Sequence, residues 1–199
     1  VIDDADTVLT FDPHPLTVLH PEAAPKLIMP ANVKRDVIDG LGVEEMVVIP
    51  FDREFSQLSA EDFIKRILVE RLGAKRVSVG ENFRFGAKAK GDPEMLASHD
   101  EFETRVVPLV EVDGETVSSS RVRALVAAGE VEASMRCLGA QSMLEGEVGE
   151  GDKRGRELGF PTANVCTVNE LVPPSGVYAT LVTIDGVVHP SITNIGVRP

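Results

Sequence analysis

The strongest candidate for chemistry in the sequence is a glycine-rich, basic segment that ends in a threonine and an asparagine. Residues 151–164 read Gly-Asp-Lys-Arg-Gly-Arg-Glu-Leu-Gly-Phe-Pro-Thr-Ala-Asn. Glycines let backbone amides approach an anion closely, and the three basic side chains offset phosphate charge. Thr162 and Asn164 alternate along an extended segment, and both carry oxygen ligands of the kind that Mg²⁺ prefers. The segment therefore favours a Mg²⁺–nucleotide loop, and a basic β-turn is the alternative.

Three other segments carry polar side chains at or after expected strands. A loop with Asn82 and Phe85 could hydrogen-bond to and stack on a planar ring system, or could be anchored in the core by its phenylalanines. The segment Ser118–Arg123 combines hydroxyls, helix N-terminal amides and arginines, which suits a phosphate group; an ordinary serine cap is the alternative. Asp12 and His14 lie on a proline-rich turn, where such a pair is often structural.

The apolar pattern in the first two thirds of the chain predicts alternating strands and helices. Strands are predicted at 8–11, 46–49, 77–79 and 106–110, and helices at 33–41, at 59–73, from Asp92, and from Ser118 towards Leu138 with a break at Gly129. Ser59 is expected to cap its helix with Asp62 as a partner. Strands separated by helices imply a doubly wound parallel sheet, in which ligands lie beyond the carboxyl ends of the strands.

The pattern changes in the last third of the chain, where helical periodicity ends. Residues 177–184 are rich in β-forming residues, and Asp185-Gly186 supplies a tight turn into Val187-Val188. This part is therefore predicted to be an antiparallel β domain. We place the α/β domain at residues 1–138 and the β domain at 139–199.

Charge and composition narrow the possible partners. The 199 residues carry a formal net charge of −12, which repels phosphate backbones and anionic membranes as a whole. Tryptophan is absent and tyrosine occurs once, so stacking platforms for single-stranded nucleic acid are scarce. No apolar stretch approaches the ~20 residues that cross a bilayer, and the two cysteines lack metal-ligand spacing. We expect a cytoplasmic protein with no nucleic-acid partner and no membrane partner.

The motifs together resemble a known family. Residues 151–164 resemble the riboflavin kinase signature, and the segments around Asp12, Asn82 and Ser118–Arg123 resemble the adenylyltransferase half of bacterial bifunctional riboflavin kinase/FMN adenylyltransferases. The Ser-Ser-Thr-x-Ile-Arg box of that family appears here as Ser-Ser-Ser-Arg-Val-Arg. The resemblance implies a Rossmann-like nucleotidyltransferase domain followed by an antiparallel β-barrel kinase domain. It also implies phosphorylation of riboflavin to FMN and adenylylation of FMN to FAD, with ATP as substrate and Mg²⁺ as cofactor.

The same resemblance assigns ligand contacts to individual residues. In the kinase half, the ATP contacts are Gly151, Arg156, Thr162 and Asn164, of which Thr162 and Asn164 bind the metal. In the adenylyltransferase half, the ATP contacts are Ser119, Ser120 and Arg123, and the flavin contacts are Asn82, Phe85 and Asp12.

Two departures from the family pattern bear on catalysis. The family's early loop with two histidines and its kinase glutamate base have no counterpart here, so no catalytic residue is assigned. The histidines that are present, His14, His20, His99 and His189, lie in other contexts. We therefore expect the sequence to be incomplete at the start of the first domain and at the end of the second. Two alternatives stay open: a flavin- or nucleotide-binding module without turnover, and an adenylyltransferase for a different acceptor.

Overall fold

The structure, a computed structural model, describes residues 6–149 and 162–196, and its internal contacts divide the chain into two compact units. The first unit comprises Val1–Pro25 and Ala31–Thr116, and the second comprises Lys26–Pro30 and Val117–Pro199. The short segment Lys26–Pro30 thus packs with the second unit, although residues of the first unit flank it in the sequence.

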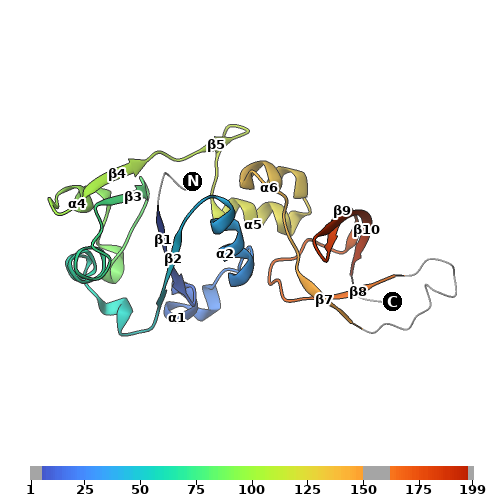
Figure 1. Cartoon of the computed structure of the whole chain (residues 1–199), viewed down its shortest axis with the longest axis horizontal. Coiled ribbons are helices and arrows are strands. Elements are labelled where there is room, and N and C mark those ends of the chain that lie inside the picture. Colours follow the sequence, from blue (N-terminus) through green and yellow to red (C-terminus); the bar gives the residue numbers. More distant parts are fainter. Residues whose placement is uncertain (1–5, 150–161, 197–199) are drawn as a thin grey trace. The chain divides into compact units, whose positions relative to one another are not determined.

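The first unit alternates strands with helices along the chain (Figure 1). Its strands are β1 (Thr7–Asp12), β2 (Glu45–Pro50), β3 (Arg76–Gly80), β4 (Glu103–Val107), β5 (Glu111–Val112) and β6 (Glu115–Thr116). Its helical segments are α1 (Pro15–Leu19), η1 (Pro21–Ala23), α2 (Ala31–Gly40), η2 (Phe55–Gln57), α3 (Ala60–Asp62), η3 (Phe63–Arg71), η4 (Ala87–Ala89) and α4 (Pro93–Ala97). The first three predicted strands and the first three predicted helices are therefore confirmed, to within a few residues at their ends.

Parallel pairing joins the four longer strands two by two. β1 pairs with β2 along its six residues, and β3 pairs with β4 along its five residues. The prediction of parallel strands is confirmed for these pairs. In the described residues, however, the pairs form separate two-stranded sheets and not the one continuous sheet that we predicted. Side-chain packing therefore holds the two pairs together, in place of a shared ladder of backbone hydrogen bonds.

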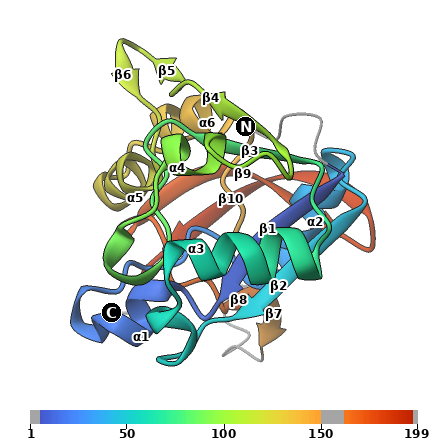
Figure 2. The same cartoon turned by 90° about the vertical axis from the view of Figure 1, so that its left-hand side faces the viewer.

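One hydrophobic core connects the two strand pairs. Its buried members come from β2, the α3–η3 helix, the loop after β3, α4 and the residue before β4: Ile49, Ala60, Phe63, Ile64, Ile67, Leu68, Phe85, Leu96 and Phe102. Leu9 and Phe11 of β1 pack against this core, so strand alternation directs Thr10 and Asp12 to the opposite face. α2 and the α3–η3 helix lie on opposite sides of the β1–β2 pair (Figures 1 and 2). The polar face of β1 is thus the face that meets α2.

The helix over residues 60–71 begins as the sequence predicts. Ser59 Oγ accepts a hydrogen bond from the backbone N of Asp62 at 3.0 Å and donates one to its Oδ2 at 2.6 Å. Beyond Asp62 the helix continues in π-helical form over Phe63–Arg71, which is unusual because π-helix rarely exceeds a single turn. Its buried face nevertheless contains four of the five apolar residues that the periodicity selects, Phe63, Ile64, Ile67 and Leu68, while the fifth, Leu72, is half-buried at the end of the helix.

The fourth strand differs from its prediction. β4 ends at Val107, whereas the apolar run extends to Val110. Pro108 has no N–H to donate, and it stands at the end of the ladder for that reason. A short hairpin of β5 and β6 follows, with Asp113 and Gly114 at positive φ in its turn. Strands of two residues are too short to produce a readable alternation, so the sequence did not predict them.

The second unit combines two helices with two antiparallel strand pairs. Its elements are α5 (Ser119–Ala128), α6 (Val131–Leu138), β7 (Gly146–Gly149), β8 (Asn164–Thr167), β9 (Gly176–Ile184) and β10 (Val187–Ile195). Gly129, at φ +81°, ends α5 where a break was predicted. Asp185 and Gly186 turn β9 into β10, also as predicted.

The two helices pack with the β part of this unit. Val122 and Val126 of α5 form a buried cluster with Leu171, and Ile28 from the Lys26–Pro30 segment packs against it. β7 pairs with β8, and β9 pairs with β10, so the antiparallel character of this part is confirmed. The strands described here form two separate pairs and no closed barrel. The barrel therefore stays a prediction.

Candidate functional site

The carboxyl end of β1 carries two of the candidate residues. Asp12 is exposed, and its carbonyl oxygen accepts from the backbone N of Phe51 at 3.0 Å. His14 Nδ1 accepts from the backbone N of Leu16 at 3.2 Å and so caps the first turn of α1. His14 therefore has a structural role as the N-terminal cap of α1. The Asp12 carboxylate, by contrast, lies exposed at the edge where parallel strands bind their ligands.

The loop after β3 is anchored in its middle. Phe85 and Gly91 form an isolated bridge with N···O distances of 3.2 and 2.9 Å. The Phe85 ring is only 7% exposed, stacks on Phe83 with 5.6 Å between centroids and lies 5.5 Å from the ring of Phe63. Phe85 is thus anchored in the core in this structure, whereas Asn82 is exposed. Contact of either side chain with a flavin stays a prediction.

Two phenylalanines that follow β2 extend this ring cluster towards β1. Phe51 and Phe55 lie 5.6 Å apart, and Phe11 lies 5.4 and 5.7 Å from them. Phe55 also meets Phe63 at 6.4 Å. The rings of Phe11, Phe51 and Phe55 are half-buried and give the carboxyl ends of β1 and β2 an apolar edge. Sequence reasoning missed them as a group, although a phenylalanine at or just after each of two successive strands was the available signal.

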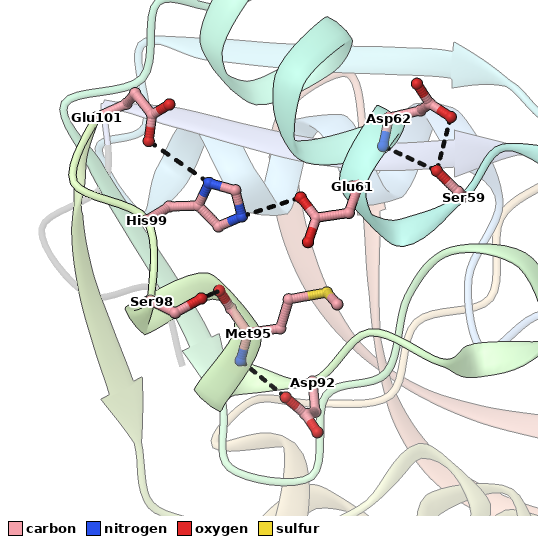
Figure 3. A network of polar contacts seen from close by, with 8 residues as sticks. All are labelled: Ser59, Glu61, Asp62, Asp92, Met95, Ser98, His99 and Glu101. Atoms are coloured by element: carbon pink, nitrogen blue, oxygen red, sulfur yellow. Dashed lines mark hydrogen bonds and ion pairs between the residues drawn. The ribbon is translucent and has the colours of Figure 1, made fainter.

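A network of polar contacts surrounds His99 in the first unit (Figure 3). Its Nε2 lies 3.3 Å from a carboxylate oxygen of Glu61, and its Nδ1 lies 3.4 Å from one of Glu101. The ring also stacks on Phe102. Only the doubly protonated imidazole can donate to both carboxylates. These contacts connect α3 with the segment between α4 and β4, which is a structural role for His99.

In the second unit, the segment Ser118–Arg123 begins helix α5. Ser118 Oγ accepts from the backbone N of Arg121 at 3.1 Å, so the ordinary serine cap is present. Ser119 and Ser120 occupy the first turn and are exposed. The cap uses one amide of the helix N-terminus, and the neighbouring hydroxyls remain at the surface, which is compatible with a phosphate ligand.

Arg123 connects this helix to the Lys26–Pro30 segment. Its Nε donates to the carbonyl oxygen of Lys26 at 2.7 Å. The next amide along the segment, that of Leu27, donates to Glu170 Oε2 at 2.8 Å. The sequence did not predict either bond, because both join residues that are far apart in the chain. Arg123 is therefore already held by the protein through one of its N–H groups.

The glycine-rich segment is described only at its end. Gly151 and Arg156 lie outside the described residues, whereas Thr162 and Asn164 lie within them. Thr162 is exposed, and Asn164 is the first residue of β8, where it pairs with Gly149 at the end of β7. The hydroxyl of Thr162 and the amide oxygen of Asn164 are hard donors that fit Mg²⁺. Their joint action on one metal ion stays a prediction.

Asn169 holds the base of the β7–β8 pair and was not singled out from the sequence. Its Oδ1 accepts from the backbone N of Glu145 at 2.8 Å, and its Nδ2 donates to the carbonyl of Met143 at 3.1 Å. Its backbone N donates to Oγ1 of Thr167 at 3.1 Å. The residue is buried, at 8% exposure. Asn169 thereby fixes the strand that carries Asn164.

Removing the Asn169 side chain is expected to destabilise the second unit. Asn169→Ala removes the buried amide that bonds to the backbone of Glu145 and Met143, at a cost of about 1–3 kcal/mol. Asn194→Ala, which truncates an exposed asparagine of β10, serves as the matched control and should stay within about 0.5 kcal/mol of wild type. Thermal unfolding measures both, and equal midpoints for the two variants would contradict the role of Asn169.

Among residues 6–149 and 162–196, no cluster of three or more His, Cys, Asp or Glu side chains could hold a metal ion. Within the same ranges, no helix has the length and apolar character needed to cross a membrane. Cys137 and Cys166 are free thiols.

Known proteins resemble both parts of the chain. A family model described as FAD synthetase matches residues 4–121, and one described as riboflavin kinase matches residues 138–199. The bifunctional riboflavin kinase/FMN adenylyltransferases of Pseudomonas fluorescens and Bacillus subtilis (strain 168) are both 38% identical to the chain, over 195 and 199 residues. The Escherichia coli (strain K12) protein of the same name is 34% identical over 196 residues. Each alignment covers 96% of this chain and 62%, 62% and 63% of these relatives, respectively.

A solved structure described as a macrolide-efflux protein from Streptococcus pneumoniae is also similar. It matches with a TM-score of 0.85 and 28% identity, over 96% of this chain and 63% of that one. The chain thus spans a little under two thirds of the length of the relatives that it matches. Because the first family model covers more than half of the chain, the chain belongs to the FAD synthetase family, with a match to riboflavin kinases over residues 138–199.

Proposed function

We propose that the protein carrying this chain makes both flavin cofactors, by phosphorylating riboflavin to FMN and adenylylating FMN to FAD. The observation that carries this proposal is the presence of a FAD synthetase match and a riboflavin kinase match in one chain. The two activities share a metabolite, because the product of the kinase reaction is the acceptor of the adenylyl group. ATP is the donor in both reactions, Mg²⁺ is the cofactor, and we place the protein in the cytoplasm without nucleic-acid or membrane partners.

The kinase reaction is assigned to the glycine-rich segment. Thr162 and Asn164 would hold Mg²⁺, and Gly151 and Arg156 would contact the phosphates of ATP. A bound Mg²⁺ supplies charge neutralisation on the phosphates, which is the main requirement of phosphoryl transfer. The exposure of Thr162 and the position of Asn164 at the start of β8 support this assignment.

The adenylyl transfer is assigned to two groups of residues. Ser119, Ser120 and Arg123 would bind the phosphates of ATP, and Asn82, Phe85 and Asp12 would bind the flavin. Hydroxyls and amides at the start of α5 support the first group, because helix N-termini favour anions and can stabilise negative charge that develops during reaction. The exposure of Asn82 and Asp12 supports the second group, whereas Phe85 would need to act through the ring cluster or move.

We propose that the adenylyltransferase domain covers residues 1–138 and the kinase domain covers residues 139–199. The gap between the two family matches, residues 122–137, contains most of α5 and α6. In the folded chain these helices group with the second unit through contacts such as those of Val122 and Val126 with Leu171. The helices therefore connect the two domains in sequence and pack within the second unit.

Arg123→Ala in the full-length protein tests the adenylyltransferase assignment. We expect formation of FAD from supplied FMN to fall about 10- to 100-fold, since charged hydrogen bonds of this kind are strong, while formation of FMN from riboflavin is retained. Arg66→Ala, at an exposed arginine of η3, is the matched control and should leave both rates unchanged. Chromatographic separation of the flavins measures both products. A loss of kinase activity alone would refute the assignment.

A further inference from the structure

Lys34 places a half-buried ammonium group near the carboxyl end of β1. It lies in the first half of α2, and its Nζ donates to Oγ1 of Thr10. Thr10 faces away from the hydrophobic core, as does Asp12 two residues further along the strand. α2 connects β1 to its parallel partner β2, so the chain enters α2 from the carboxyl end of β1. The N-terminal end of α2 therefore lies at the edge where ligands of such sheets bind. Lys34 therefore stands beside that edge.

The described residues offset only part of the cost of burying this ammonium group. Burial lowers the pKa of Lys34 below its ordinary value of 10.5, and the carboxylate of Asp12 opposes this with a smaller upward effect. Within the described ranges no carboxylate forms an ion pair with Lys34 inside 4.0 Å. Of its three N–H groups, one donates to a described side chain. An anion that accepts the remaining N–H groups would offset the cost of burial.

The neighbouring charges make Lys34 distinctive on this helix. Arg35 is exposed and pairs with Asp36 at 3.0 Å, so its charge is already partnered. The chain as a whole carries a net charge of −12 and repels anions at long range. A phosphate-bearing ligand at the carboxyl end of β1 consequently needs a local cation, and Lys34 supplies one.

We infer that Lys34 binds a phosphate group of a substrate of adenylyl transfer, as a binding residue additional to those assigned above. The inference rests on the proposed adenylyl transfer and adds one contact to it. Thr10 holds the end of the lysine side chain in place, and Asp12 favours its charged form. Both FMN and ATP carry the required phosphate chemistry, and the experiment distinguishes between them.

Steady-state kinetics of FMN adenylylation in the full-length protein test the inference. Lumiflavin keeps the flavin ring but has no ribityl phosphate and no hydroxyl to phosphorylate, and adenosine lacks the phosphates of ATP, so their inhibition constants report binding without the phosphate contact. Lys34→Met keeps an apolar stem and removes the charge. We expect it to raise the KM for FMN or for ATP about 10- to 100-fold and to leave the inhibition constant of the matching competitor within about twofold. The substrate whose KM rises is the one that Lys34 contacts.

Two variants serve as controls. Lys34→Arg keeps a positive charge and should retain most of the affinity, while Arg35→Met changes an exposed neighbour and should leave every constant unchanged. Phosphorylation of riboflavin should be unaffected in all three variants. The KM of the wild type should also rise with pH as the Lys34 ammonium loses its proton. The Lys34→Arg variant should not show this rise, because guanidinium stays protonated.

Several outcomes overturn the inference. One is an unchanged KM for both substrates in Lys34→Met, and another is an equal rise in a KM and in the inhibition constant of its competitor. If Lys34→Met fails to fold, the pH profiles decide, and parallel profiles for wild type and Lys34→Arg overturn the inference. A wild-type protein that does not adenylylate FMN at all would instead refute the proposed function.

Discussion

Thr162→Ala in the full-length protein is expected to abolish formation of FMN from riboflavin and to leave adenylylation of supplied FMN intact. The variant removes a proposed Mg²⁺ ligand of the kinase site. Loss of a residue that merely supports a metal ligand typically costs about 10- to 100-fold, so loss of a direct ligand should cost about 100-fold or more. Asn164→Ala should behave in the same way, because it removes the second proposed ligand. Chromatography of the flavin products from riboflavin or from FMN measures the two activities separately.

Matched variants make this result specific. Thr162→Ser keeps the hydroxyl and should restore much of the kinase activity. Thr183→Ala truncates an exposed threonine of β9 and should change neither activity. Kinase turnover that survives in Thr162→Ala and in Asn164→Ala would contradict the metal assignment. An equal loss of both activities would point to damaged folding, which the unfolding midpoint of each variant would reveal.

Gly86→Ala is expected to cause a large loss of stability in the first unit. Gly86 has φ +71°, and an added Cβ would lie 2.6 Å from both the N and the Cα of Ala60. With ψ at 174°, Gly86 has a backbone conformation that is almost restricted to glycine; it costs about 1–3 kcal/mol in a residue with a side chain, and overpacking adds about 1–3 kcal/mol. The expected loss is therefore about 2–6 kcal/mol in total. Because Phe85 precedes Gly86, the variant should also raise the KM for FMN in adenylylation.

Gly114→Ala is the matched control for this effect. Gly114 has a similar φ of +75°, but an added Cβ there would meet no heavy atom within 4 Å. The control therefore also puts a side chain at positive φ, but without the overlap, and it should lose only about 1–2 kcal/mol. Thermal unfolding should give Gly86→Ala the lower midpoint. Equal midpoints would mean that the loop does not approach Ala60 as closely as the structure indicates.

Local patterns predicted the elements of the fold well, and their pairing less well. The apolar runs at β1, β2 and β3 and the helical spacing of residues 60–71 are signals contained in neighbouring residues. The end of β4 depended on Pro108, which the apolar run obscured. The π-helical form of η3 has no separate signature, because the same apolar spacing fits an ordinary helix.

Some candidate residues could be named from the sequence because they lie within short motifs. The Thr162 and Asn164 pair and the Ser118 cap are visible in consecutive residues. The burial of Phe85 was one of two alternatives that the sequence left open, because it depends on Gly91 and on rings from distant segments. The Lys34–Thr10 contact likewise joins residues 24 positions apart, and only the packing of α2 on β1 brings them together.

The most direct test of the central claim follows the phosphorus atoms of ATP into flavin products. The full-length protein is incubated with riboflavin, Mg²⁺ and ATP that is labelled at either the γ- or the α-phosphorus, and the flavins are separated. The account predicts that γ-label enters FMN and is retained in FAD, whereas α-label enters FAD alone. Absence of γ-label from both flavin nucleotides, or absence of α-label from FAD, would contradict it.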